Sequence, residues 1–214
     1  MGELPNLIVK EFEKKGINKL NPAQEKAVKS GILEGENILV CSPTGSGKTM
    51  IASFALAKML GNGKAVYVVP LKALASEKFK DYTKFLEGSR YTVAYSTGDM
   101  DSDSEYLRKY DLIILTVEKF DSLIRHRSKW INDVSLVIVD EIHLLNDPGR
   151  GPTLEIVITL LKKLLKNVQI VALSATIGNP EELAEWLDAK LVYDEWRPVK
   201  LEKGVYYEGE VEFQ

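Results

Sequence analysis

Seven short apolar runs, separated by longer segments of helical periodicity, recur along this chain of 214 residues. The runs are rich in β-branched residues and lack the polar alternation of a strand that has one face in water. They cover residues 38–41, 65–69, 92–95, 112–115, 136–139, 169–173 and 191–193. The helical segments lie near residues 22–30, 48–60, 73–86, 118–125, 153–165 and 180–187. Strands that are apolar on both faces and alternate with helices predict an α/β fold, in which a mainly parallel sheet carries helices on both faces.

The composition excludes several classes of protein. Hydrophobic residues make up 45% and charged residues 28% of the chain, with a formal net charge of −3, as in a folded globular domain. No apolar run is long enough to cross a bilayer, so we expect no membrane partner. A single cysteine, Cys41, and a start without the apolar stretch of a signal peptide predict a cytoplasmic protein. Because the net charge is slightly negative, any nucleic-acid binding would have to come from a local patch.

A glycine-rich segment follows the first apolar run and precedes a helical segment. Its residues are Ser42, Pro43, Thr44, Gly45, Ser46, Gly47, Lys48 and Thr49. The last three match the phosphate-loop pattern G-x-x-x-x-G-K-[ST], whereas Ser42 replaces its first glycine. In such a loop the backbone N–H groups bind phosphate oxygens, Lys48 reaches the β- and γ-phosphates, and the Thr49 hydroxyl binds Mg²⁺. A surface loop that matches by chance is the alternative, but the strand–loop–helix context favours a phosphate loop.

Two adjacent carboxylates, Asp140 and Glu141, directly follow the apolar run at residues 136–139. Paired carboxylates at the end of a buried strand are costly unless a cation or a reaction needs them. Beside a phosphate loop, we expect Asp140 to bind Mg²⁺ and Glu141 to polarise the water that attacks the γ-phosphate. A strand that simply ends in solvated acidic residues is the alternative.

The order of these and other motifs resembles the first motor domain of the superfamily 2 DExH-box helicases, and most closely the archaeal Hjm-type DNA-repair helicases of the superkiller-like branch. The matching segments are residues 20–24 (Q motif), 42–49 (motif I), 69–78 (motif Ia), 96–99, 116–120 (motif Ib), 140–143 (motif II) and 174–176 (motif III). The resemblance covers nearly the whole chain and implies a RecA-like P-loop NTPase domain that binds ATP and Mg²⁺. It implies that Gln24 reads the adenine edge. Residues implied to couple nucleotide state to motion are His143, Ser174 and Thr176.

The resemblance also implies contacts to nucleic acid after the ends of three predicted strands. The residues concerned are Pro70, Lys72, Thr97, Gly98, Thr116 and Lys119. Small hydroxyls and free N–H groups there can hold phosphates without reading bases. Taken singly, each residue fits a turn or a helix cap at least as well. The densest basic cluster is more simply a solvated helix face, although it lies just past the proposed nucleic-acid motif; its residues are Lys119, Arg125, His126, Arg127 and Lys129.

The resemblance therefore implies the motor domain of an ATP-dependent 3′-to-5′ DNA helicase that acts on single-stranded, forked or branched DNA in repair. We expect residues 1–200 to form this ATP-binding domain and residues 201–214 to begin a connection to a second motor domain. The second domain would supply an arginine finger, so we expect this chain alone to bind ATP weakly and hydrolyse it very slowly. Two alternatives stay open: an RNA helicase of the same branch, and a stand-alone nucleotide-dependent module that binds nucleic acid.

Overall fold

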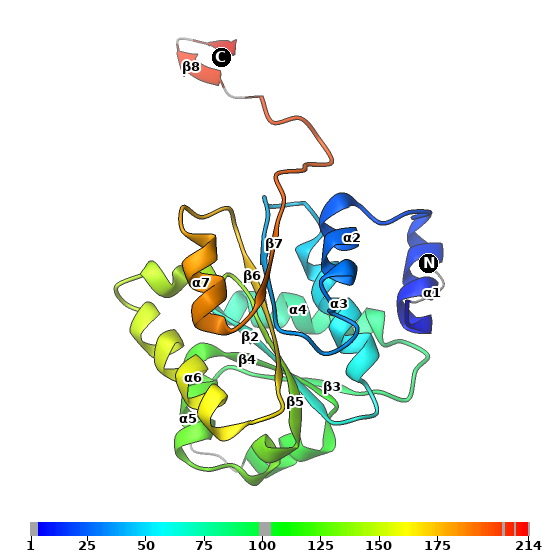
Figure 1. Cartoon of the computed structure of the whole chain (residues 1–214), viewed down its shortest axis with the longest axis vertical. Coiled ribbons are helices and arrows are strands. Elements are labelled where there is room, and N and C mark those ends of the chain that lie inside the picture. The colour runs from blue at the N-terminus through cyan, green and yellow to red at the C-terminus, as the bar shows by residue number, and fades with distance from the viewer. Residues whose placement is uncertain (1–3, 99–103, 203, 208, 214) are drawn as a thin grey trace.

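The computed structural model describes residues 4–98, 104–202, 204–207 and 209–213 of the chain. Its main body is a seven-stranded sheet with helices on both sides (Figure 1). The strands are β1 (Ile38–Cys41), β2 (Lys64–Val69), β3 (Val93–Ser96), β4 (Leu112–Thr116), β5 (Val134–Val139), β6 (Gln169–Ser174) and β7 (Lys190–Tyr193). They lie in the order β3-β4-β2-β5-β6-β1-β7, and every pairing between them is parallel. The predicted α/β fold with a mainly parallel sheet is confirmed.

Two layers of helices cover the two faces of the sheet. One layer holds α1 (Asn6–Lys15), α2 (Pro22–Lys29), α3 (Lys48–Met59) and α4 (Lys72–Phe85). The other holds α5 (Val117–Arg125), α6 (Gly151–Leu164) and α7 (Pro180–Leu187). Short 3₁₀ turns are η1 (Ser104–Lys109), η2 (Lys129–Asp133) and η3 (Ile142–Asn146). Along β1 the side chains of Ile38 and Val40 enter the first core, while Leu39 and Cys41 enter the second. This burial on both faces explains why the strand sequences lack polar alternation.

Two parts of the structure were not predicted from the sequence. Helix α1 begins after Pro5 and ends where Gly16 adopts a left-handed conformation with φ 64°. It buries only Ile8 and Phe12, so its apolar periodicity is short. The second part is an antiparallel hairpin of β8 (Gly204–Tyr207) and β9 (Glu210–Phe213), which extends away from the main body (Figure 1).

A parallel sheet brings the carboxyl ends of all its strands to one edge. The segments that follow β1, β2, β4 and β5 all contain residues predicted to be functional. The opposite, amino edge holds the starts of the strands.

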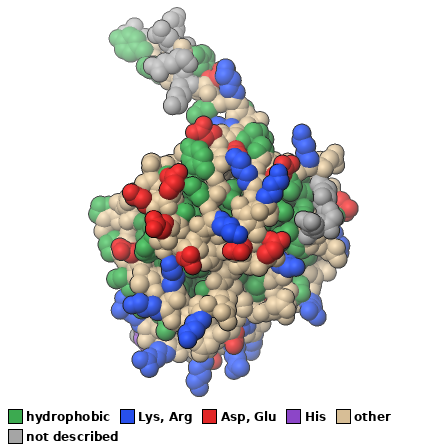
Figure 2. Space-filling model, in the orientation of Figure 1, with side chains coloured by type: hydrophobic (Ala, Val, Ile, Leu, Met, Phe, Trp, Pro, Cys, Tyr) green, Lys and Arg blue, Asp and Glu red, His purple; other side chains and the backbone are tan. Residues whose placement is uncertain are grey.

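On the face shown in Figure 2, Lys and Arg side chains gather toward the lower end, whereas Asp and Glu lie mostly higher. The described part of the chain contains no helix with the length and apolar character needed to span a membrane.

Candidate nucleotide-binding site

The glycine-rich loop lies between β1 and α3, in the predicted strand–loop–helix arrangement. Gly45 and Gly47 have positive φ angles of 82° and 87°, which only glycine adopts without strain. The hydroxyl oxygens of Ser42 and Ser46 are 2.7 Å apart, so these two side chains bridge the base of the loop. Ser42, Pro43 and Ser46 are buried, whereas Thr44 and Gly45 form the exposed tip. The loop is therefore held from beneath, with its tip open to a ligand.

Helix α2 begins beside this loop through a reciprocal cap. The side chain of Asn21 accepts a hydrogen bond from the Gln24 N–H at 2.9 Å, and the Asn21 N–H donates to Gln24 Oε1 at 3.1 Å. Asn21 Nδ2 also donates to the Ser46 carbonyl at 2.8 Å. A Cβ atom placed on Gly47 would lie 3.0 Å from Gln24 Nε2. Asn21 was missed as a site residue, although the Asn-Pro-x-Gln pattern of a capping box signals it.

Lys48 is the first residue of α3, and its ammonium group folds back onto the loop. Nζ donates to the Ser42 carbonyl at 2.7 Å and to the Pro43 carbonyl at 3.1 Å. Burial lowers the pKa of Lys48, and the carboxylates of Glu141 and Asp140 oppose this shift. The lysine is thus bonded to the loop and lies within the electrostatic influence of the acidic pair. Burial also raises the pKa of the nearby Cys41 thiol to about 11, so this thiol is a poor nucleophile at neutral pH.

The acidic pair follows β5 at the same edge. Asp140 is 8% exposed; its Oδ2 accepts a hydrogen bond from the Tyr67 hydroxyl at 2.9 Å and its Oδ1 accepts one from the Glu141 N–H at 3.0 Å. Burial, together with nearby Tyr82 and Asp140, raises the pKa of Tyr67 well above its usual value. Glu141 has a left-handed backbone with φ 52°, which is uncommon for a residue other than glycine. Asp140 is therefore held by two hydrogen bonds. The left-handed backbone of Glu141 turns the chain away from the strand at the residue expected to polarise the attacking water.

A third group joins the two predicted metal ligands. Lys78 Nζ donates to Thr49 Oγ1 at 3.3 Å and lies 3.7 Å from Asp140 Oδ2. Hydroxyl and carboxylate oxygens are the hard donors that Mg²⁺ prefers, and a cationic group already lies between these two. The donor set therefore fits Mg²⁺. No cluster of three or more His, Cys, Asp or Glu residues that could hold a metal occurs within the described residues.

Motifs II and III meet at His143. The Ala175 N–H lies 3.4 Å from His143 Nδ1, and Glu141 Oε2 lies 3.4 Å from the same nitrogen. An unprotonated Nδ1 can accept the first bond, whereas only a protonated one can donate to the carboxylate. The two interactions therefore belong to different protonation or tautomeric states of His143. Ser174 is fully buried, whereas Thr176 is exposed.

The residues predicted to contact nucleic acid reach the same edge but differ in exposure. Lys72 and Gly98 are exposed, Thr97 is half-buried and Pro70 is buried. Thr116 is buried and caps α5, because its Oγ1 accepts a hydrogen bond from the Lys119 N–H at 3.3 Å. The Lys119 side chain is buried as well. Helix capping, the local alternative, is therefore what Thr116 does in this structure. Asp99, the last residue of the segment 96–99, lies outside the described residues.

A cavity of about 710 Å³ opens beside the loop. Its lining includes Gln24, Gly45, Gly47, Thr49, Lys78 and Trp196. Trp196 is 38% exposed, and its backbone N–H donates to Asp194 Oδ1 at 2.7 Å. Phe12, which precedes the Q motif in the sequence, does not line this cavity. It packs in the core, where its ring centroid lies 6.2 Å from that of Phe54.

Comparisons with known proteins identify the family of the chain. The model of the DEAD/DEAH box helicase family matches residues 21–183. The ATP-dependent DNA helicase Hel308 of Pyrococcus abyssi is 57% identical over 204 residues, which cover 94% of this chain and 28% of that protein. The Hel308 of Methanocaldococcus jannaschii is 52% identical over 214 residues, covering 96% of this chain and 17% of that protein. The chain thus spans less than a third of the length of these relatives.

Solved structures show the same fold. A crystal structure of the DUF1998 helicase MrfA has a TM-score of 0.78 at 26% identity, covering 89% of this chain and 33% of that one. A second MrfA structure, bound to DNA and AMPPNP, has a TM-score of 0.78 at 22% identity, with coverage of 92% and 30%.

Proposed function

The chain belongs to the DEAD/DEAH box helicase family, and from this premise we propose that it is the ATP-binding motor domain of an ATP-dependent DNA helicase. One observation carries the proposal: a glycine-rich loop, its half-buried lysine and a carboxylate pair that includes the buried Asp140 assemble at the carboxyl edge of a parallel sheet. Ligands of doubly wound sheets bind at this edge. Residues 1–200 would form this domain, and residues 201–214 would begin the connection to a second motor domain.

The loop and its lysine would bind the triphosphate. The hydrogen bonds that Lys48 Nζ now makes to the Ser42 and Pro43 carbonyls can be exchanged for bonds to the β- and γ-phosphate oxygens. The loop backbone from Thr44 to Thr49 would supply N–H donors at the start of α3, where the helix dipole favours anions. Gln24 would read the adenine edge while remaining part of the cap that holds the loop.

The hydrolytic groups would be Asp140 and Glu141. Thr49 and Asp140 would hold Mg²⁺, which neutralises phosphate charge when it is bound. Glu141 would orient and deprotonate the attacking water, and its turned backbone brings its carboxylate off the strand axis. His143 would couple Glu141 to the segment of Ser174 and Thr176. Its Nδ1 lies 3.4 Å from Glu141 Oε2 in motif II and 3.4 Å from the backbone nitrogen of Ala175 in motif III.

DNA is the proposed polymer because the Hel308 relatives compared above are named DNA helicases. Unwinding of forked or branched DNA in the 3′-to-5′ direction, and a role in repair, are part of this proposal. The exposed Lys72 and Gly98 and the half-buried Thr97 are the residues best able to contact a phosphate backbone. Consistent with a reducing compartment, the single cysteine is buried and free, so we also infer a cytoplasmic location.

ATP turnover by a protein that carries this chain and a second motor domain tests the proposal. We expect single-stranded DNA to stimulate turnover more strongly than RNA of the same length and sequence. Stimulation by RNA alone would instead support an RNA helicase of the same family. Nucleotide-dependent DNA binding without turnover would support a stand-alone binding module and contradict the helicase proposal.

A further inference from the structure

Lys78 lies on a face of α4 that would ordinarily be apolar. Its neighbours on this face, Ala75 and Tyr82, are both buried in the core between α4 and the sheet. Only 11% of the Lys78 side chain is exposed. A buried ammonium group is unfavourable unless it is paired, and lysine is among the residues least often found buried.

The ammonium group of Lys78 is held by the two oxygens that the proposed function assigns to the metal. It donates to Thr49 Oγ1 at 3.3 Å and lies 3.7 Å from Asp140 Oδ2. The hydroxyl of Tyr67 contacts the same carboxylate oxygen at 2.9 Å. Lys48 also lies within the electrostatic influence of Asp140, but its ammonium group is bonded to its own loop. Lys78 is therefore the cation that directly bridges both oxygens.

We propose that Lys78 is a built-in counterion that keeps a divalent metal out of the nucleotide-free site and yields only when the metal arrives with nucleotide phosphates. The inference rests on the proposed function, because it takes Thr49 and Asp140 as the metal donors. A divalent ion and the ammonium group compete for the same two oxygens and repel each other. The negative charge of the bound phosphates attracts both cations and so offsets the repulsion between them. The metal can then bind to the two oxygens.

Manganese binding to the nucleotide-free chain tests the proposal directly. Mn²⁺ serves as the probe because it shares the preference of Mg²⁺ for oxygen ligands and its free form gives an EPR signal. We expect weak binding to the wild type and at least about tenfold tighter binding to Lys78→Met, which removes the competing charge and keeps the chain length. Adding Asp140→Asn to that variant should abolish the gain. Equal Mn²⁺ affinity of the wild type and Lys78→Met would overturn the proposal.

A matched control lies on the same helix. Lys80 is two residues further along α4 and is exposed, so Lys80→Met should bind Mn²⁺ as the wild type does. An equal gain in both variants would indicate a general charge effect and would also overturn the proposal. If Lys78→Met does not fold, Lys78→Gln removes the charge while retaining a polar group that can still bond to Thr49.

Nucleotide binding in the same samples separates this inference from the proposed function. A fluorescent ADP analogue, titrated with and without Mg²⁺, should bind to the wild type and to Lys78→Met. The variant should need less Mg²⁺ to reach half-maximal binding. Failure of the wild type to bind the analogue would contradict the proposed function itself. Binding by both proteins with the same Mg²⁺ requirement would contradict only the role of Lys78.

Discussion

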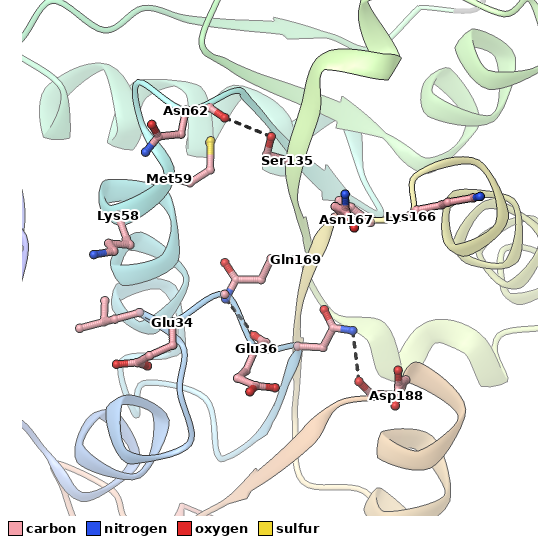
Figure 3. Close-up of a pocket in the computed structure, with 14 residues that line it drawn as sticks. Glu34, Glu36, Lys58, Met59, Asn62, Ser135, Lys166, Asn167, Gln169 and Asp188 are labelled. Carbon is pink, nitrogen blue, oxygen red and sulfur yellow. Dashed lines mark hydrogen bonds between the residues drawn. The ribbon is translucent and has the colours of Figure 1, made fainter.

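The two edges of one sheet both carry a cavity and polar side chains, yet they use them differently. The cavity at the amino edge is about 540 Å³ and lies among the starts of β1, β5 and β6 (Figure 3). There Gln169 Nε2 donates to the carbonyls of Ile32 at 2.9 Å and Glu36 at 2.8 Å, and Ser135 Oγ donates to the Asn62 carbonyl at 3.3 Å. Each of these neutral side chains completes the hydrogen bonding of a nearby backbone group.

At the carboxyl edge the polar groups are charged, buried and bonded to one another. Lys78 and Asp140 are both buried, and Glu141 adopts a left-handed backbone. Such an arrangement costs stability unless a ligand or a reaction needs it. The comparison teaches that a cavity alone does not mark a functional site in this fold. Buried charge combined with backbone strain does mark the functional site. Paired substitutions at the two edges can test this distinction.

The largest contrast is expected between two glutamates. In a protein with both motor domains, Glu141→Gln removes the proposed general base and should lower ATP turnover about 10²–10⁴-fold. ATP binding should persist, because Glu141 is not part of the phosphate loop. Glu36→Gln at the amino edge breaks only an exposed ion pair with Lys190 and should leave turnover unchanged. Steady-state ATPase assays check both, and normal turnover by Glu141→Gln would remove that residue from its role.

Two lysines at opposite ends of α3 give the next contrast. Lys48→Met removes the charged donor of the loop and should weaken ATP binding by about ten- to a hundredfold. Lys58→Met changes an exposed residue that lines the amino-edge cavity and should have no effect. Isothermal titration of the 214-residue chain measures both affinities. Similar losses in the two variants would mean that the nucleotide is not bound at the carboxyl edge.

The reverse test uses the amino edge, where stability rather than binding should change. Gln169→Leu leaves the Ile32 and Glu36 carbonyls without their donor and should lower the free energy of unfolding by about 1–3 kcal/mol. ATP affinity of the folded variant should stay at the wild-type value. Urea denaturation and nucleotide titration provide the two measurements. A loss of ATP affinity without a loss of stability would reverse the assignment of the edges.

The sequence predicted the elements of the sheet well because their patterns are local. All seven strands were expected within two residues of their observed bounds, since burial on both faces leaves continuous apolar runs. Helix α1 was missed because only Ile8 and Phe12 mark its buried face. The hairpin β8–β9 was missed because its side chains at Val205, Tyr206 and Tyr207 are exposed and follow no core pattern.

The candidate site was predictable only where one motif contains the whole interaction. Lys48 and the loop carbonyls lie within six residues of each other, so the motif implies their contact. Lys78, by contrast, reaches Asp140 from 62 positions away in the sequence, and Tyr67 reaches it from 73. Such contacts depend on how α4 and β2 pack against β5, which no local pattern encodes. The one available signal was a lysine on the buried face of an amphipathic helix.

The smallest contrast, and the sharpest, compares two glycines with similar positive φ angles. Gly47 at the carboxyl edge has φ 87° and Gly35 at the amino edge has φ 89°. Alanine at either position should cost about 1–2 kcal/mol of stability, because a left-handed conformation strains any residue that has a Cβ atom. At Gly35 this Cβ would meet nothing within 4 Å, whereas at Gly47 it would lie 3.0 Å from Gln24 Nε2 and 3.1 Å from Asn21 Nδ2. Gly47→Ala should therefore also displace the cap of α2 from the loop and weaken ATP binding, while Gly35→Ala should bind ATP normally. Since the strain is common to both variants, any difference in their ATP affinity isolates the contact between the loop and the cap. Equal affinities would show that this contact does not position the loop for nucleotide.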